Sequence, residues 1–229
     1  MPANRAERFM KFLGVVKSVL RSASRKCLWA YARWAPYHWK KEGLVMKLSH
    51  YLGLDGEELL PGVLRFGGSI LCRLSEELQQ RIYYFGTYEP RTEELVHRLV
   101  NRGAVVLDVG ANIGIYSLLA AKKAGAQGKV IALEPVPAIF RQLCEGLRRN
   151  GCSTVTPLNC AAWRVNGEVQ MGCPDVKGNS GSYGIERQGT VESIVRVKAM
   201  RLDDLLNPMN LPRVDLIKMD IEGPELPAL

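Results

Sequence analysis

Short apolar runs alternate with amphipathic stretches between residues 93 and 219, and this alternation predicts strands and helices in turn. The clearest run, 105–107, is rich in β-branched residues and ends on Asp108, as a strand buried on both faces does. The spacing predicts an α/β fold with a right-handed parallel sheet and a ligand site at the carboxyl edge of its strands. Further strands are predicted at 129–133, 155–158, 195–199 and 214–219, and helices at 93–100, 115–121, 137–149 and, as a short turn, 202–206.

A second apolar pattern, with helical spacing, lies near the N-terminus, and most of the basic residues between positions 5 and 25 lie off it. Aromatic and basic residues follow at 29–39. Two interpretations stay open. The apolar face packs on the main domain as a helical cap, or residues 1–40 make peripheral contact with a membrane surface. The stripe consists of Phe9, Phe12, Leu13, Val16, Val19, Leu20 and Ala23.

The segment 104–121, AVVLDVGANIGIYSLLAA, combines a buried strand, a permissive turn and the start of a helix. Gly110, Asn112 and Gly114 tolerate positive φ, so the chain can fold tightly under a ligand and aim helix N–H groups at it. Asp108 precedes the turn, and its charge repels a phosphate but suits a cation or a hydroxyl. S-adenosylmethionine therefore fits this pattern better than a dinucleotide, which stays a rival along with a non-catalytic binding or membrane-interaction module.

A second acidic residue strengthens the cofactor prediction. Glu134 closes the next predicted strand, where a carboxylate can accept hydrogen bonds from both hydroxyls of a ribose. After the third predicted strand, the segment from Asn159 to Ala162 supplies small side chains against which an adenine can lie. We therefore predict Asn159 and Ala161 as further cofactor-binding residues.

An acidic block, Asp220, Glu222 and Glu225, follows the predicted strand 214–219 on the ligand side of the sheet. Lys218 lies within that apolar strand and must pair with one of these acids, since an unpaired buried ammonium is too costly. No histidine falls on a loop after a strand, so Asp220, and then Glu222, are the candidate general bases. The alternative is a structural role in helix capping and neutralisation of Lys218. A third hypothesis, that these two acids hold a metal ion, has less support, because two ligands do not make a metal site. We therefore predict no metal.

Two glycine-containing parts of the chain show little periodicity. For residues 53–68 we predict a connecting segment or hairpin. Asn166-Gly167 predicts another hairpin, and 175–189 either covers the substrate as a loop or is a disordered insertion.

Charge is unevenly placed along the 229 residues. Residues 1–50 hold 11 Lys or Arg and 2 acids, a net of +9, which leaves 20 against 21, a net of −1, for residues 51–229. The basic character thus belongs to the extension and argues against a nucleic-acid groove on the main domain. Six cysteines without a C-x-x-C pair favour a reducing compartment, and no run reaches the length of a membrane span or a signal-peptide core. We expect a cytoplasmic protein, with the peripheral contact left open.

The runs VVLDVGANIGIYSLLAA, VIALEP, RLDDLL and VDLIKMDIEGPEL, in this order, resemble the FkbM-type class I methyltransferases, and TYEP is similar to a segment upstream of their cofactor motif. The resemblance covers about residues 84–229, with 1–50 as a basic helical extension and 51–83 as a connecting segment. It implies a Rossmann-like sheet and S-adenosylmethionine-dependent methylation of a hydroxyl on a small molecule or saccharide. Carried over, Asp108, Gly110, Asn112 and Gly114 line the methionine moiety, Glu134 holds the ribose, and Asp220, Glu222 and Glu225 lie near the substrate.

The resemblance has one departure. A class I methyltransferase sheet has seven strands, whereas this chain stops at Leu229, just after its fourth core strand. We expect either an incomplete product or a partner chain that completes the sheet, and an exposed apolar edge at 214–219. The methyl acceptor and the oligomeric state are not predicted.

Overall fold

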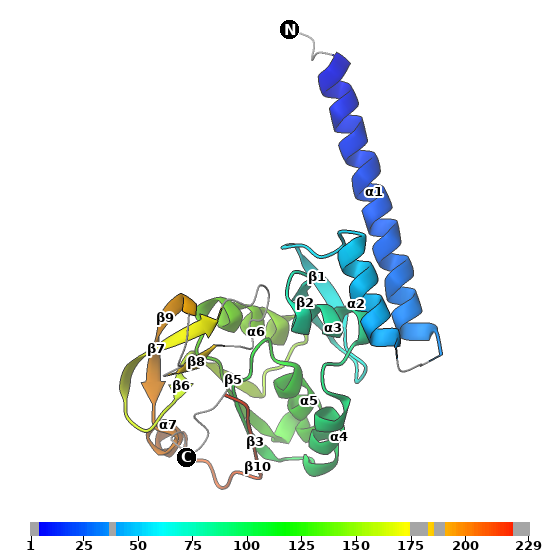
Figure 1. Ribbon diagram of the computed structural model, residues 1–229. Helices are drawn as coiled ribbons and strands as arrows, with labels where there is room; N and C mark the ends of the chain where they lie inside the picture. The colour runs from blue at the N-terminus through cyan, green and yellow to red at the C-terminus, as the bar shows by residue number, and fades with distance from the viewer. Residues whose placement is uncertain (1–4, 37–39, 175–182, 186–190, 222–229) are drawn as a thin grey trace.

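The computed structural model describes residues 5–36, 40–174, 183–185 and 191–221 (Figure 1). A parallel sheet of four strands in the order β10-β3-β4-β5 forms its centre. Alternate residues of β3 face two different cores, so this strand is buried throughout, as its apolar run predicted. The strands are β3 (Val105–Val109), β4 (Lys129–Leu133), β5 (Val155–Leu158) and β10 (Leu216–Met219).

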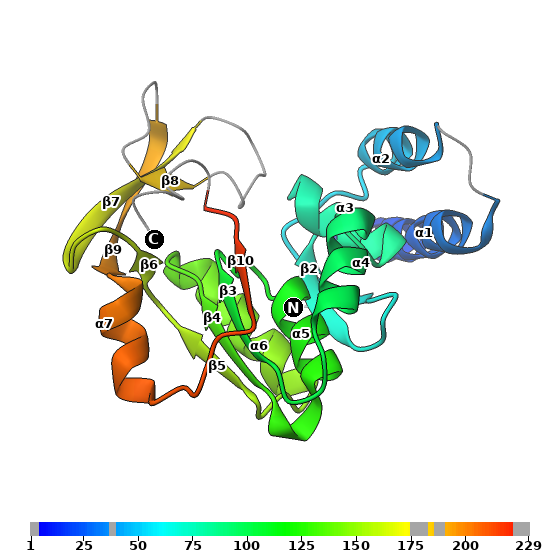
Figure 2. The ribbon, with the colours of Figure 1, turned by 90° about the horizontal axis from the view of Figure 1, so that it is seen from below.

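Helices cover both faces of this sheet. Helices α4 (Pro90–Leu99), α5 (Ile115–Ala124) and α6 (Pro137–Arg149) belong to the larger core, which contains Val106 and Val130 of the sheet. Helix α7 (Leu202–Leu206) packs on the opposite face, against Leu107 and Ile131, and Figure 2 shows the sheet between α7 and α5. Short 3-10 turns follow α5 at Gly125–Gln127 and α7 at Asn207–Met209. Every predicted helix of the main domain is therefore confirmed, and 137–149 matches α6 at both ends.

Strand β10 differs from its prediction. The strand begins at Leu216, two residues later than predicted. Asp215, directly before it, donates its N–H to the carbonyl of Val105 and accepts a hydrogen bond from the N–H of Val105 with its side chain, each at 2.8 Å. It was predicted as buried, but it pairs only with β3 among the described strands, and Ile217 is 44% exposed. The expected exposed apolar edge is confirmed for the described residues.

A second sheet follows β5, in the order β6-β9-β7-β8. The predicted hairpin at Asn166-Gly167 is wrong, because β6 and β7, on either side of it, pair with opposite edges of β9 and not with each other. Asn166 instead ties the turn to the end of β9. Its side chain accepts a hydrogen bond from the N–H of Arg201 and donates one to Asp204. The strands are β6 (Ala161–Ala162), β7 (Gly167–Pro174), β8 (Gly184–Ile185) and β9 (Val191–Met200).

The N-terminal part consists of α1 (Arg5–Trp34), α2 (Lys41–Tyr51), the antiparallel hairpin β1 (Leu59–Val63) with β2 (Ser69–Arg73), and α3 (Glu77–Phe85). The hairpin expected within 53–68 therefore exists, with its second strand beyond that range. Ile70 and Cys72 of β2 join the core under α6, and α3 runs across the predicted segment limit at residue 83. None of the helices in the described residues is both long and apolar enough to cross a membrane.

Helix α1 is confirmed, but one interpretation of its apolar stripe is wrong. The helix packs through Leu28 and Ala32 on a small core around Tyr84, whereas Phe12 and Leu20 of the stripe are 63% and 62% exposed. The stripe therefore does not pack as a cap on the described part of the main domain. The stripe stays exposed because Leu28 and Ala32, through which the helix packs, lie on the opposite face of α1.

Candidate functional site

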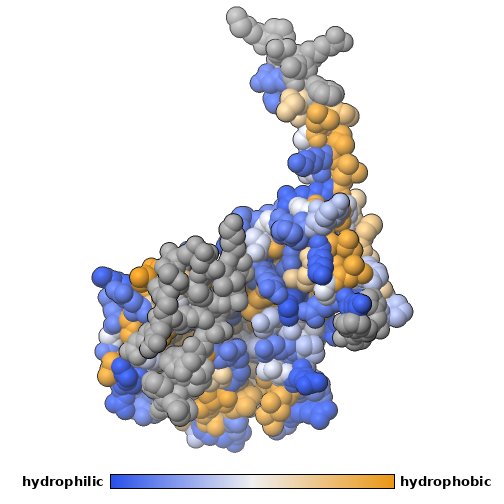
Figure 3. Space-filling view, in the orientation of Figure 1, coloured by the Kyte–Doolittle hydropathy of each residue, from blue (hydrophilic) through white to orange (hydrophobic). Residues whose placement is uncertain are grey.

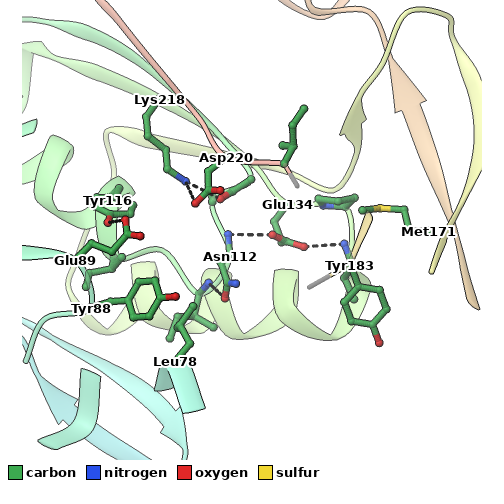
Figure 4. Close-up of a pocket in the computed structure, with 17 residues that line it drawn as sticks. Leu78, Tyr88, Glu89, Asn112, Tyr116, Glu134, Met171, Tyr183, Lys218 and Asp220 are labelled. Carbon is green, nitrogen blue, oxygen red and sulfur yellow. Dashed lines mark hydrogen bonds and ion pairs between the residues drawn. The ribbon is translucent and has the colours of Figure 1, made fainter. Parts of the chain in front are cut away.

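An open cavity of about 180 Å³ lies at the carboxyl edge of β3, β4 and β10 (Figure 4). This is where an open α/β sheet holds its ligand. It is lined by α3, the segment before α4, the turn between β3 and α5 with the start of α5, the segment after β4, the second sheet and the end of β10. Its walls include Leu78, Tyr88, Glu89, Gly110, Asn112, Tyr116, Glu134, Met171, Tyr183, Lys218, Asp220 and Ile221.

The turn after β3 has the backbone that its residues predicted. Gly110, Asn112 and Gly114 have φ of 78°, 49° and 95°. A Cβ at Gly110 would lie 2.1 Å from the carbonyl oxygen of Asp220, so only glycine lets the ends of β3 and β10 come this close. The N–H groups of Gly110 and Ala111 both donate to the carbonyl of Leu133, which fixes the turn over the end of β4.

Glu134 faces this turn from the end of β4. It is 5% exposed and accepts two backbone hydrogen bonds, from Asn112 to Oε2 and from Val136 to Oε1, each 2.9 Å. Burial raises the pKa of the carboxyl to about 7, while the two N–H donors act in the opposite direction. Each oxygen keeps a further lone pair, so a carboxylate already oriented by the backbone remains able to accept a ligand hydroxyl.

Asp108 is more enclosed than the sequence suggested. It is 1% exposed, and Oδ2 accepts a hydrogen bond from Ser117 (2.6 Å). Oδ1 accepts no hydrogen bond from the described residues and lies 3.6 Å from Nζ of Lys218. The carboxylate does not belong to the cavity wall. The negative charge of Asp108 therefore interacts mainly with Lys218 of the protein itself.

Lys218 links the ends of β3 and β10. Its ammonium donates to the carbonyl of Gly110 (3.1 Å), lies 3.6 Å from Asp220 and 5.0 Å from the ring centre of Tyr116. The prediction that Lys218 pairs with an acid of the block after its strand is confirmed by Asp220. The side chain of Asp220 is 58% exposed, so it presents a carboxylate on the open side of the cavity.

Sequence reasoning missed the contribution of the segment before α4. Tyr116 donates a hydrogen bond to Oε2 of Glu89 (2.8 Å), and both residues line the cavity beside Tyr88. Burial, together with this carboxylate, raises the pKa of the Tyr116 hydroxyl. Two signals were available: the resemblance of TYEP, residues 87–90, to a segment upstream of the family's cofactor motif, and an acid directly before Pro90, which places Glu89 at a helix N-terminus. Met171 comes from β7, and no pattern in the sequence indicated its position. Tyr183, directly before β8, belongs to the 175–189 segment, for which a loop over the substrate was one of the two expectations.

The remaining predicted site residues have separate places. Asn159 donates to the carbonyls of Glu134 (2.8 Å) and Pro135 (2.9 Å), so it supports the segment after β4 and does not line the cavity. Ala161 lines a neighbouring cavity of about 20 Å³ that shares Gly110 and Pro135 with the larger one. Glu222, Glu225 and most of the 175–189 loop lie outside the described residues. Within the described residues, no three His, Cys, Asp or Glu side chains are grouped to hold a metal ion.

A parallel sheet, a glycine turn at its carboxyl edge and a buried carboxylate after the neighbouring strand define a Rossmann-like ligand-binding domain. The Methyltransferase FkbM domain matches residues 108–229, more than half of the chain. This chain therefore belongs to the FkbM methyltransferase family, as the sequence motifs indicated.

Individual relatives agree with the family. The chain is 29% identical over 141 residues to "Methyltransferase 1" of Beauveria bassiana, covering 54% of this chain and 56% of the relative. It is 30% identical over 143 residues to the "Hexuronic acid methyltransferase AglP" of Haloferax volcanii, covering 61% and 56%. A solved structure of a SAM-dependent methyltransferase from Aquifex aeolicus is similar with a TM-score of 0.28 and 28% identity, over 29% of this chain and 36% of that one.

The chain spans a little over half the length of the curated relatives it matches. The family match favours a methyltransferase domain over the dinucleotide-binding domain that the sequence left as a rival.

Proposed function

We propose that this domain binds S-adenosylmethionine and takes part in methyl transfer to a hydroxyl oxygen of a small molecule or saccharide. The observation that carries the proposal is the pair formed by the Gly110–Gly114 turn and the buried Glu134 carboxylate across one cavity. The turn before α5 donates an N–H to this carboxylate, whose charge disfavours a pyrophosphate there, and the same carboxylate can accept hydrogen bonds from a ribose diol.

The residues present fit this cofactor. Glu134 would accept hydrogen bonds from the ribose hydroxyls with the lone pairs that Asn112 and Val136 leave free. The turn 110–114 would lie against the methionine moiety, and Ala161, which lines the neighbouring small cavity, would contact the adenine. Asp108 would act through Lys218 and Ser117 as a positioning residue, and its unfilled Oδ1 could accept one further hydrogen bond.

Bound S-adenosylmethionine would supply a methyl group on a sulfonium sulfur. The protein then has to align the acceptor oxygen with that methyl group and take up one proton. Asp220 is our first candidate for the base, because its carboxylate is on the cavity wall and largely exposed to an acceptor. Glu222, the second candidate, follows two residues later. The cofactor would supply the electrophilic methyl group, and the carboxylate of Asp220, or of Glu222, would take up the proton that the acceptor hydroxyl loses.

Two observations support an oxygen acceptor. The chain is similar to a protein named as a hexuronic acid methyltransferase, which favours a saccharide oxygen as the acceptor. The segment Asp220-Ile221-Glu222-Gly223 also differs from the N/D-P-P-Y sequence of amino-methylating enzymes of this fold.

Calorimetric titration with S-adenosylhomocysteine tests the cofactor proposal on this chain directly. We expect saturable binding that Glu134→Ala weakens by about 100-fold, because two charge-assisted hydrogen bonds are lost. Glu145→Ala is the matched control. It makes the same substitution at a partly exposed glutamate of α6, whose surface ion pairs with Arg148 and Arg149 add little, and it should leave binding unchanged.

A folded wild-type chain that binds no S-adenosylhomocysteine, or that binds NAD instead, would refute the proposal. The role of Asp220 needs a second measurement. Asp220→Asn should keep the affinity for S-adenosylhomocysteine within about threefold, because its side chain is largely exposed, and should lower methyl transfer by about 100-fold or more. Equal loss of both would assign Asp220 to binding.

A further inference from the structure

Helix α1 is attached to the rest of the chain by one face of its C-terminal half. Leu28 and Ala32 are buried there, and Arg25 donates a hydrogen bond to Glu58 (2.6 Å). Arg33 donates to the carbonyl of Tyr84 (2.8 Å), and Arg21 to that of Asp55 (2.7 Å). Figure 1 shows that the N-terminal half extends beyond the rest of the chain. The attachment therefore fixes which way the free half of the helix faces.

The apolar stripe faces away from that attachment. Helical residues are about 100° apart, so the centre of the stripe lies about 140° around the helix axis from the centre of Leu28 and Ala32. Figure 3 shows hydrophobic residues along the edge of α1 that is turned away from the rest of the chain. The large described side chains of the stripe are all exposed: Phe12 (63%), Leu13 (43%), Val16 (37%), Val19 (61%) and Leu20 (62%). Val15, which lies beside the stripe, is 62% exposed.

Basic residues border the stripe on both sides. At about 100° per residue, Lys11 and Lys17 lie on opposite flanks of the apolar arc, and both are exposed. Residues 1–50 carry a net charge of +9, whereas the remaining 179 residues carry −1. Lysines in these positions can extend their ammonium groups to phosphate headgroups while the apolar side chains between them enter the acyl region.

We propose that α1 lies on an anionic lipid surface with its apolar stripe inserted. The helix would be parallel to the membrane plane, and the folded domain would stay on the aqueous side, because it is attached to the opposite face of α1. This inference does not depend on the proposed methyl transfer.

The width and charge of the surface favour lipid over a second copy of the chain. A coiled coil needs only a narrow seam, such as the one through Leu13, Val16 and Leu20. The apolar arc of α1 is wider than that seam, because it also includes Phe12, Val15 and Val19. Two extensions, each with a net charge of +9, would also repel each other, whereas an anionic surface attracts both.

Co-sedimentation of the full chain with phosphatidylcholine vesicles containing about 30% phosphatidylserine tests the proposal. We expect wild type to bind and Val16→Asn/Leu20→Asn to bind at least tenfold less, because two apolar side chains no longer enter the acyl region. Ser18→Asn/Ser22→Asn is the matched control. It places the same residues at the same spacing on exposed positions of the polar face, so vesicle binding should stay within about twofold of wild type.

The charge contribution is tested separately. Lys11→Gln and Lys17→Gln should each lower binding to the anionic vesicles about fivefold and leave binding to pure phosphatidylcholine unchanged. Far-ultraviolet circular dichroism checks that all variants keep their helix content.

Two results would overturn the proposal. One is equal vesicle binding by the Val16→Asn/Leu20→Asn variant and the Ser18→Asn/Ser22→Asn control. The other is a wild-type dimer in light scattering, without vesicles, that Val16→Asn/Leu20→Asn converts to monomer, since this would assign the stripe to a second copy of the chain.

Discussion

The carboxyl edge of the central sheet buries charged side chains, whereas the N-terminal half of α1 exposes apolar ones. At the sheet edge, the carboxylates Asp108 and Glu134 are 1% and 5% exposed. On α1, Phe12 and Leu20 are apolar but more than 60% exposed. A buried polar group and a large exposed apolar patch are both uncommon in folded proteins and mark regions that interact with something else.

The two regions differ in how far the chain itself compensates for this unusual burial or exposure. Asp108 has Ser117 and Lys218, and Glu134 has two backbone N–H groups, so most of the cost of burying these charges is offset within the fold. The exposed face of α1 packs against nothing else in the described residues. We infer that the sheet edge is organised before its ligand arrives, whereas the α1 stripe requires an external surface to be covered.

The largest expected effect is at Gly110. Gly110→Ala would place a Cβ 2.1 Å from the carbonyl oxygen of Asp220 at a φ of 78°. Gly103→Ala is the matched control, because its φ of 76° is nearly the same but no atom lies within 4 Å of the added Cβ. We expect Gly103→Ala to lower the free energy of unfolding by about 1–2 kcal/mol, and Gly110→Ala by at least about 2 kcal/mol more. Urea denaturation measures both, and equal losses would show that β10 can move away from the turn.

The next effect compares the two acids that pair with Lys218. Asp108→Asn should lower the free energy of unfolding by about 2–3 kcal/mol, because a buried ammonium loses its enclosed counter-charge. Asp220→Asn should cost less than about 1 kcal/mol, since this partner is at the same 3.6 Å distance but its side chain is 58% exposed. Thermal and urea unfolding measure the difference. Equal costs would mean that burial does not decide the strength of this ion pair.

A smaller effect concerns pH. The pKa of Glu134 is about 7 in the folded chain, and a ribose diol binds the ionised carboxylate, so the affinity for S-adenosylhomocysteine should rise about tenfold from pH 6 to pH 8. The Glu134→Gln variant should bind more weakly and show no such rise. Calorimetric titration at several pH values measures it, and a flat wild-type profile would contradict the role of Glu134.

The same group has the opposite effect on stability. Its folded pKa of about 7 is above the ordinary value of 4.5, so the folded chain binds more protons than the unfolded chain between these limits. The contribution of Glu134 to the free energy of unfolding should therefore fall as pH rises through this window, and the stability difference from Glu134→Gln isolates it.

The smallest expected effect is on α1. Val19→Ala should change the free energy of unfolding by less than about 0.5 kcal/mol, because this side chain is already 61% exposed. Leu28→Ala on the buried face of the same helix should cost about 2–5 kcal/mol. Urea denaturation of the two variants measures the contrast, and a large cost at Val19 would show that the stripe is packed within the chain.

The sequence by itself determined the local features of this protein. It predicted β3, β4, β5 and α6 with nearly correct limits, and the positive φ values of the turn after β3, because hydrophobic periodicity and glycine conformation depend on neighbouring residues. It also placed Glu134 beside that turn, since the ends of consecutive parallel strands meet at one edge of a sheet.

Only the tertiary structure decided which distant groups meet. Lys218 reaches Asp108 from 110 positions away, Glu89 meets Tyr116 across two elements, and β6 and β7 lie on opposite sides of β9. The direction of the α1 stripe was likewise undetermined, because amphipathicity defines a face of a helix but not what that face meets. These contacts depend on packing between segments far apart in the chain, and no short-range pattern of residues encodes them.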